Sequence, residues 1–442
     1  MKKTLLLTSL VASMVAMAGT TGSVEAYNEN EATFVKGANP TFVAKKTGVK
    51  TEVKVEGTGF SFGGDFKAED LELGKVTKAN YLNHSSVWAK YELPELSGVK
   101  TYVKATLSPK FVDENDAYKF DGSAELEGQA SYKYDVLTFG LNSKTNFPFR
   151  LSQGNTDYGK DVKSTHKFFV ESEEKKDVFV KGLKDVKASL EIKHNYAKVA
   201  ATPGSRVDYV KGNFELAYDG VKDLRMDGKV DFTVNVNGPK ELGDTKLGDY
   251  NLKDYEFGEA ISKTDVDFVH TYNAKLTYTG VKGLTLAVAP FVSHYRTSGT
   301  SLVVNNVIYG TSLKAEYKML NNQLTLTGKS LLAGKSKSVN DMHSNIGLIS
   351  FNTNVKYDYK VSDKFTVSPE ADAKLELLIA NHQTVPYLTL TPKVSAEYKP
   401  TDTLTLKGSV EAPVKFGVNA QNKFDYLQTQ LKTSLNLKYE WK

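Results

Sequence analysis

Histidines are the first candidates for chemistry in this sequence, because neutral imidazole binds metals and acts as a general base near neutral pH. They are scattered along the chain, at His84, His166, His194, His270, His294, His343 and His382. No two of them have the spacing that places a pair of metal ligands on one face of a helix. We therefore predict neither a metal site nor a bound cofactor.

Motifs for covalent chemistry are also missing. The chain has no cysteine, no Gly-x-Ser-x-Gly and no phosphate-binding loop, and Lys46-Thr47-Gly48 is an isolated tripeptide. We predict that the protein is not an enzyme. A hydrolase whose serine and histidine meet only in space stays open as an alternative.

Charged residues form a third group, and these alternate regularly with apolar ones. In such a pattern the charged side chains share one face of a strand, where they would line water. The candidates for a pore lining are Lys356, Asp358, Lys360, Glu370, Asp372, Lys374, Glu376, Lys407, Glu411, Lys415, Lys432 and Lys438. A slight excess of lysine suggests weak anion preference, but we favour the interpretation that most of these charges pair with one another.

The elements that carry these residues follow a period of two, which predicts strands. The clearest is 427–441, longer than the about six residues of an average globular strand. One of its faces is apolar and the other polar. The apolar face holds Leu427, Leu431, Leu435, Leu437, Tyr439 and Trp441, and the polar face holds Gln428, Gln430, Lys432, Asn436, Lys438 and Glu440.

A second regularity is a hairpin repeat. One strand ends in tyrosine, a short turn of Gly, Asn, Asp or Pro follows, and the next strand opens on an apolar residue. The aromatic residues at this place are Tyr218, Tyr278, Tyr317, Tyr359, Tyr398, Tyr439 and Trp441. The opposite connections are longer, near 63–81, 143–165, 237–268 and 333–346. Such asymmetry is typical of outer-membrane barrels, whose aromatic belts lie at the membrane interface.

We therefore predict an all-β fold, a closed antiparallel transmembrane β-barrel of about 16–18 strands with short periplasmic turns and long extracellular loops. A β-propeller or a soluble β-solenoid is the less favoured architecture, because the strands are too long for propeller blades. The acidic connection 237–268 either folds into the barrel or remains a solvated surface loop, and its charges favour the second.

The first residues have the pattern of a secretory signal peptide. Lys2 and Lys3 precede an apolar run at 5–18, and Val24-Glu25-Ala26 is a cleavage pattern. We predict a signal peptide at 1–26, with a second possible cut after Ala18. Residues 27–48 do not alternate cleanly, so we expect a periplasmic or lumenal segment there and the barrel at 49–442.

The signal peptide, the tyrosine-ended hairpins and the final Leu435-x-Leu437-x-Tyr439-x-Trp441 resemble Gram-negative outer-membrane porins, although Lys442 departs from their aromatic end. The resemblance implies a protein of the bacterial cell outer membrane that is inserted into the lipid bilayer by the assembly machinery. It also implies passive diffusion of small hydrophilic solutes, including ions, and possible homotrimers. A surface adhesin or antigen displayed on a barrel is the alternative. Because the basic residues are dispersed, we expect no nucleic-acid partner.

Overall fold

A computed structural model gives the fold of most of the chain. It describes residues 19–72, 85–114, 117–152, 155–158, 162–199, 202–236, 246–247, 250–251, 266–298, 303–339, 342–380, 383–418 and 423–441. Within these ranges no helix is long and apolar enough to cross a bilayer.

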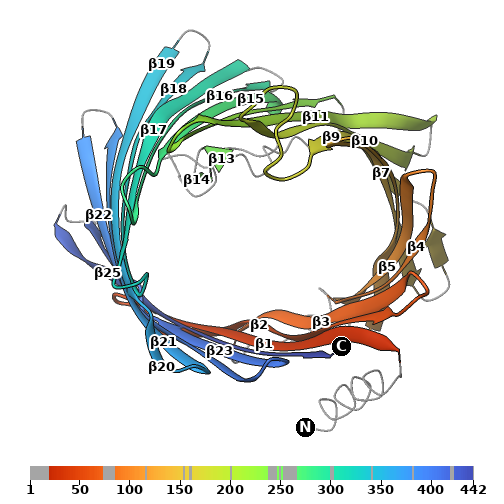
Figure 1. Ribbon diagram of the computed structural model, residues 1–442, viewed down its shortest axis with the longest axis horizontal. Helices are drawn as coiled ribbons and strands as arrows, with labels where there is room; N and C mark the ends of the chain where they lie inside the picture. The colour runs from red at the N-terminus through yellow and green to blue at the C-terminus, as the bar shows by residue number, and fades with distance from the viewer. Residues whose placement is uncertain are drawn as a thin grey trace.

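The strands close into one antiparallel barrel of twenty strands, seen down its axis in Figure 1. Three of these strands are interrupted: β8 and β9 both pair with β7, β19 and β20 both pair with β21, and β23 and β24 both pair with β22. In chain order the strands are β1 Thr20–Val35, β2 Thr41–Val55, β3 Phe60–Glu72, β4 Ser86–Leu96, β5 Val99–Glu114, β6 Ala117–Tyr134, β7 Leu137–Ser152, β8 Asn155–Tyr158, β9 Val162–Ser172, β10 Leu183–Val199, β11 Thr202–Val221, β12 Leu224–Asn235, β13 Lys246–Leu247, β14 Tyr250–Asn251, β15 Val266–Tyr278, β16 Leu284–Ser298, β17 Val303–Met319, β18 Leu324–Val339, β19 Met342–Tyr357, β20 Tyr359–Ser362, β21 Phe365–Ala380, β22 Gln383–Thr401, β23 Leu404–Glu411, β24 Val414–Val418 and β25 Phe424–Trp441.

The barrel closes where the first strand meets the last. β1 pairs with β25 along nearly its whole length, from Gly22 opposite Trp441 to Val35 opposite Gln428. Every strand of the ring therefore has two neighbours and no edge is left unpaired. This closure is what allows a sheet to cross a bilayer, because its backbone polar groups find partners within the sheet.

The all-β barrel is confirmed, but the predicted count of 16–18 strands is wrong. One cause is the turn at 56–59, which divides a segment that the sequence pattern joins. Gly57 and Gly59 have φ angles of 71° and 72° there, and this left-handed conformation is readily available to glycine. The two residues reverse the chain between β2 and β3, so the predicted single strand becomes a hairpin.

The second cause lies at the N-terminus. Residues 27–48, predicted to be a periplasmic or lumenal segment, belong to β1 and β2 of the barrel wall. Their alternation is faint because the outward positions of β1 carry small or polar residues such as Ala26 and Asn28 instead of large apolar ones. β1 also starts at Thr20, inside the predicted signal peptide 1–26. Residues 1–18 lie outside the described residues.

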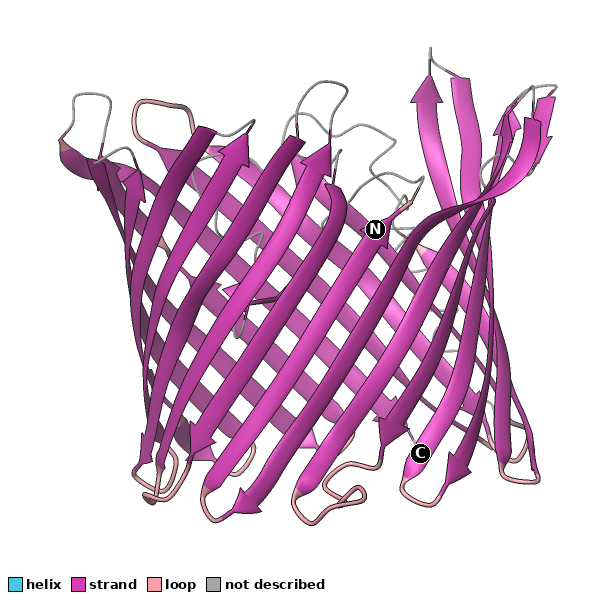
Figure 2. Cartoon of the chain, turned by 90° about the horizontal axis from the view of Figure 1, so that it is seen from above, coloured by secondary structure: helices cyan, strands magenta, loops and turns pink. Residues whose placement is uncertain are grey.

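Short connections gather at one end of the barrel, as Figure 2 shows. We call this end the short-turn end. Here the tyrosine that ends one strand lies opposite the apolar residue that opens a neighbouring strand. The pairs are Leu224 with Tyr278, Leu284 with Tyr317, Leu324 with Tyr357, Phe365 with Tyr398 and Leu404 with Tyr439. The hairpin repeat in the sequence thus corresponds to the same tyrosine–apolar pairing in successive strand pairs of the barrel.

At the other end the strands run further than the sequence indicates. β7 extends to Ser152, and β18 and β19 approach each other at Val339 and Met342, so the predicted loops 143–165 and 333–346 are mostly strand. These segments extend strand pairs that already begin at the short-turn end.

Candidate functional site: the lumenal wall

The two faces of the wall differ in chemistry. Directly opposed residues of antiparallel strands point to the same side, so a few exposed apolar residues fix the orientation of their neighbours. Leu435 is 60% exposed, Phe168 50% and Tyr309 51%. These apolar side chains form the outer surface. Residues one position away along each strand face the lumen.

The predicted pore-lining residues lie on the face opposite these apolar side chains, on β19 to β25. Several of their lysines are in ion pairs, with Nζ–O distances between 2.7 and 3.4 Å. The pairs are Lys356–Asp358, Lys374–Glu376, Lys432–Glu411 and Lys438–Glu440, and Lys407 pairs with Glu397. Lys415 instead lies over the ring of Tyr387 at 4.9 Å. Asp372 and Glu370 accept hydrogen bonds from Asn352 and Asn354. This arc of the wall is therefore charged but largely neutralised.

A second arc, on β15 to β19, is buried and partly apolar. Its cluster consists of Val269, Phe291, Tyr295, Ile308, Leu331 and Leu348. Ile308 and Ser293 have no exposed surface, which is unusual for a wall that faces a wide lumen. The short hairpin β13–β14 lies inside the ring in Figure 1, and β13 contacts β16. This part of 237–268 therefore folds inward, contrary to the solvated surface loop that the charges favoured.

A third arc, on β9 to β11, carries lysines that the sequence analysis did not single out. Lys167 and Lys211 lie on either side of Glu191 in one row across the strands. Lys193 lies over the ring of Tyr209 at 5.3 Å, and Lys163 is opposite Asn195. No ion pair within 4.0 Å joins any of the four lysines to another described residue. The sequence showed each lysine but not this grouping, which depends on the register of three strands.

The predicted belt residues lie toward the short-turn end. Tyr278, Tyr317, Tyr359, Tyr398 and Tyr439 are between 37% and 54% exposed. Tyr439 and Trp441 stack with ring centroids 6.2 Å apart. Tyr218 lies at the end of a similar strand, but its side chain is half-buried and so less exposed than those of the other belt tyrosines. Aromatic side chains at such positions offer an apolar body to lipid and a polar tip to water.

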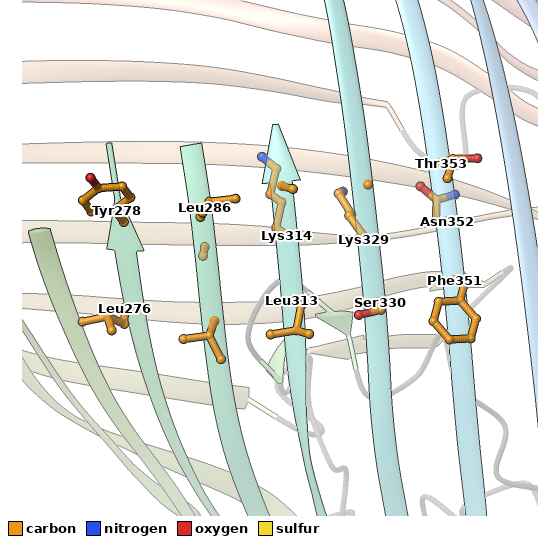
Figure 3. Close-up of a pocket in the computed structure, with 14 residues that line it drawn as sticks. Leu276, Tyr278, Leu286, Leu313, Lys314, Lys329, Ser330, Phe351, Asn352 and Thr353 are labelled. Carbon is orange, nitrogen blue, oxygen red and sulfur yellow. The ribbon is translucent and has the colours of Figure 1, made fainter. Parts of the chain in front are cut away.

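The outer surface carries an apolar groove of about 560 Å³ between β15 and β19. Figure 3 shows Leu276, Leu313 and Phe351 along it, and the small residues Ala315 and Gly328 also line it. Lys314 and Lys329 alternate with these residues and so point to the lumen. The groove therefore faces lipid and lies outside the path of a solute.

Two groups of polar side chains also face outward, between the aromatic ends of their strands. On β1, Asn28 donates a hydrogen bond to Thr47 at 2.7 Å, and Asn30 donates one to Thr433 at 3.4 Å. On β7 and β9, the Ser143 hydroxyl is 2.9 Å from Nδ1 of His166, and Thr145 is 3.0 Å from Ser164. The sequence analysis missed both groups because they interrupt the apolar face.

At the short-turn end, Glu173 follows β9 and makes ion pairs with Lys133 and Lys176. The hydrogen bond from Lys133 holds the pKa of the Glu173 carboxyl below its usual range, and Lys176 acts in the same direction. The pairs are exposed, so they stabilise the barrel little.

The described residues contain no group of three or more His, Cys, Asp or Glu side chains arranged to hold a metal ion. No protein-family model and no curated protein matches the sequence. The fold does match solved structures. The siderophore receptor PirA from Pseudomonas aeruginosa aligns over 95% of this chain and 80% of its own, at 9% identity and a TM-score of 0.51.

The fold is that of a bacterial outer-membrane β-barrel. Pseudomonas aeruginosa FpvA aligns over 95% of this chain and 72% of its own, at 10% identity and a TM-score of 0.50. OccK3 (OpdO) of the same organism aligns over 96% of each chain at 9% identity, with a TM-score of 0.45. At such identities the likeness concerns the fold. The likeness to PirA and FpvA, together with the apolar outer surface, agrees with the predicted outer-membrane location.

Proposed function

We propose that this outer-membrane barrel is a channel for the passive diffusion of small hydrophilic solutes. The observation that carries the proposal is a closed ring of twenty strands whose inner face bears charged side chains. A barrel of this size is too wide for side chains alone to fill. Charged groups on its inner face also need water, because burying them in a dry core is costly.

Within this proposal the three arcs have different roles. The ion-paired arc of β19 to β25 would form a hydrated wall. The buried arc of β15 to β19 would be the surface on which the inward hairpin β13–β14 rests and narrows the pore. Residues such as Lys374 and Glu376 would then border the path of the solute without setting a strong charge preference.

The proposal extends to partners. The lipid bilayer surrounds the outer face, and the terminal strand β25 would be recognised by the outer-membrane assembly machinery. We also propose self-association, as a homotrimer or another closed ring. Asn28 and Asn30 motivate it: each already donates a hydrogen bond within the chain, but their outward amides would also offer polar groups to a neighbouring copy within the bilayer.

A lipid hydrolase is the second candidate, favoured by one observation. Ser143 and His166 form a hydroxyl–imidazole contact on the lipid-facing surface, where a lipid ester has access. Among the described residues, however, no carboxylate or amide makes a hydrogen bond that would orient His166. We propose that the pair is structural and that the chain is not an enzyme.

Purified, refolded protein in a planar lipid bilayer tests the channel. Stepwise conductance is the expected result. Correctly folded barrel that gives no conductance steps would overturn the channel and leave a surface adhesin or antigen as the better function.

A further inference from the structure

Four lysines of β9 to β11 differ from the ion-paired lysines elsewhere on the lumenal wall. Lys163, Lys167, Lys193 and Lys211 all point to the lumen, one position away from outward residues such as Phe168 and Val210. Their side chains range from half-buried to exposed, and Lys167 and Lys211 are exposed. They are accessible from the space inside the barrel.

The strand register groups these lysines. Lys167 and Lys211 flank Glu191, and Lys193 follows in the next row. Lys163 lies further from the short-turn end on β9. It is about 13 Å from Lys167 along the strand, at about 3.3 Å per residue. The four ammonium groups thus form a ladder along the wall, called here the lysine ladder.

One carboxylate lies within the ladder, and it is already engaged. Glu191 accepts a hydrogen bond from the Tyr209 hydroxyl at 2.7 Å, and Lys193 is held over the same ring. No described carboxylate lies within 4.0 Å of a ladder ammonium group. Four positive charges against one negative charge leave the ladder with a net positive charge.

The contrast with the opposite wall is the main argument. On β19 to β25 the lumenal lysines Lys374, Lys407 and Lys432 each have a carboxylate within 3.4 Å. A paired ammonium group projects a weak field into the pore, whereas an unpaired one projects a strong field. Compared with the arc of β19 to β25, the arc of β9 to β11 therefore carries more lumenal positive charge that no neighbouring carboxylate offsets.

We propose that the lysine ladder is an anion path, which makes the channel prefer small anions such as chloride, inorganic phosphate and short carboxylates. This inference rests on the proposed channel function. An anion would exchange part of its hydration shell for successive ammonium groups along the wall. It would pass between them because none holds it permanently.

The test is the reversal potential of single channels in a potassium chloride gradient. The variant K163Q/K167Q/K193Q/K211Q should shift the reversal potential away from the equilibrium potential of chloride. The chloride-to-potassium permeability ratio should fall toward one or below. E191Q removes the single carboxylate of the ladder and should raise the same ratio. When inorganic phosphate replaces chloride, the phosphate-to-potassium permeability ratio should rank the variants in the same order.

A matched control carries the same change in net charge outside the pore wall. K181Q/K222Q/K282Q/K364Q removes four exposed lysines from the short connections, and it should leave the ratio unchanged. Gel migration before and after boiling reports whether each variant is a folded barrel.

The outcomes separate the two proposals. If the unaltered protein gives no conductance steps, the channel itself fails. If it conducts and the ladder variant keeps the reversal potential of the unaltered protein, the channel stands and the lysine ladder is overturned. An equal shift in the ladder variant and the control would also overturn it, because net charge alone would then explain the effect.

Discussion

Trp441 lies directly opposite Gly22 across the seam of the barrel, and its indole covers the glycine. A Cβ placed on Gly22 would be 2.5 Å from Cζ2 of Trp441 and 2.3 Å from the carbonyl oxygen of Glu52. The first strand can therefore lie beside the last only because it offers no side chain at this point. A glycine near the start of the sequence and a tryptophan near its end thus close the barrel together.

Gly22→Leu is expected to destabilise the closed barrel by about 1–3 kcal/mol, the usual cost of overpacking a tight site. The backbone oxygen of Glu52 has no freedom to move away, whereas the indole could move only by losing its packing. The measurement is the urea midpoint of unfolding in lipid vesicles. Gly328→Leu is the matched control, since nothing lies within 4 Å of a Cβ at that lipid-facing glycine. Equal midpoints for the two variants would contradict the role of the seam.

The mature chain is expected to begin at Gly19. Cleavage after Ala18 keeps β1 whole, while cleavage after Ala26 removes the partners of Leu437, Tyr439 and Trp441. N-terminal sequencing of protein purified from membranes decides between the two sites. A mature chain that starts at Tyr27 would contradict this expectation and would leave the seam only the pairs from Tyr27 to Val35.

Self-association is expected to depend on the outward amides of β1. The double variant Asn28→Leu/Asn30→Leu should lower the oligomer fraction, because polar contacts within membranes contribute about 1–2 kcal/mol each. The readout is chemical cross-linking in detergent, with Val103→Leu, an outward apolar exchange on β5, as the control. Oligomers that persist in the double variant would place the interface elsewhere on the outer face.

Ser143→Ala is expected to change neither conductance nor lipid turnover. This expectation follows from the proposal that the contact between Ser143 and His166 is structural. Release of fatty acid from phospholipid vesicles by the unaltered protein provides the measurement. Hydrolysis that disappears in the alanine variant would establish an enzyme and overturn that proposal.

Alternation predicted most of the wall but not all of it. The strands of the C-terminal half, such as 427–441, were anticipated because one face carries leucine and tyrosine and the other lysine and glutamate. β1 was missed because its outward positions hold Gly22, Ala26 and Asn28, which give no apolar signal. The hairpin β2–β3 was missed because only the backbone conformation of Gly57 and Gly59 divides it.

The sequence by itself determined that this chain forms long antiparallel strands with an apolar outer and a charged inner face. It could do so because the direction of a side chain in a strand is a local property with a period of two. Only the tertiary structure decided which lysines have a carboxylate, which glycine accepts Trp441 and where the hairpin β13–β14 lies. These relationships depend on register and closure, which join residues far apart in the chain, and no local pattern records them.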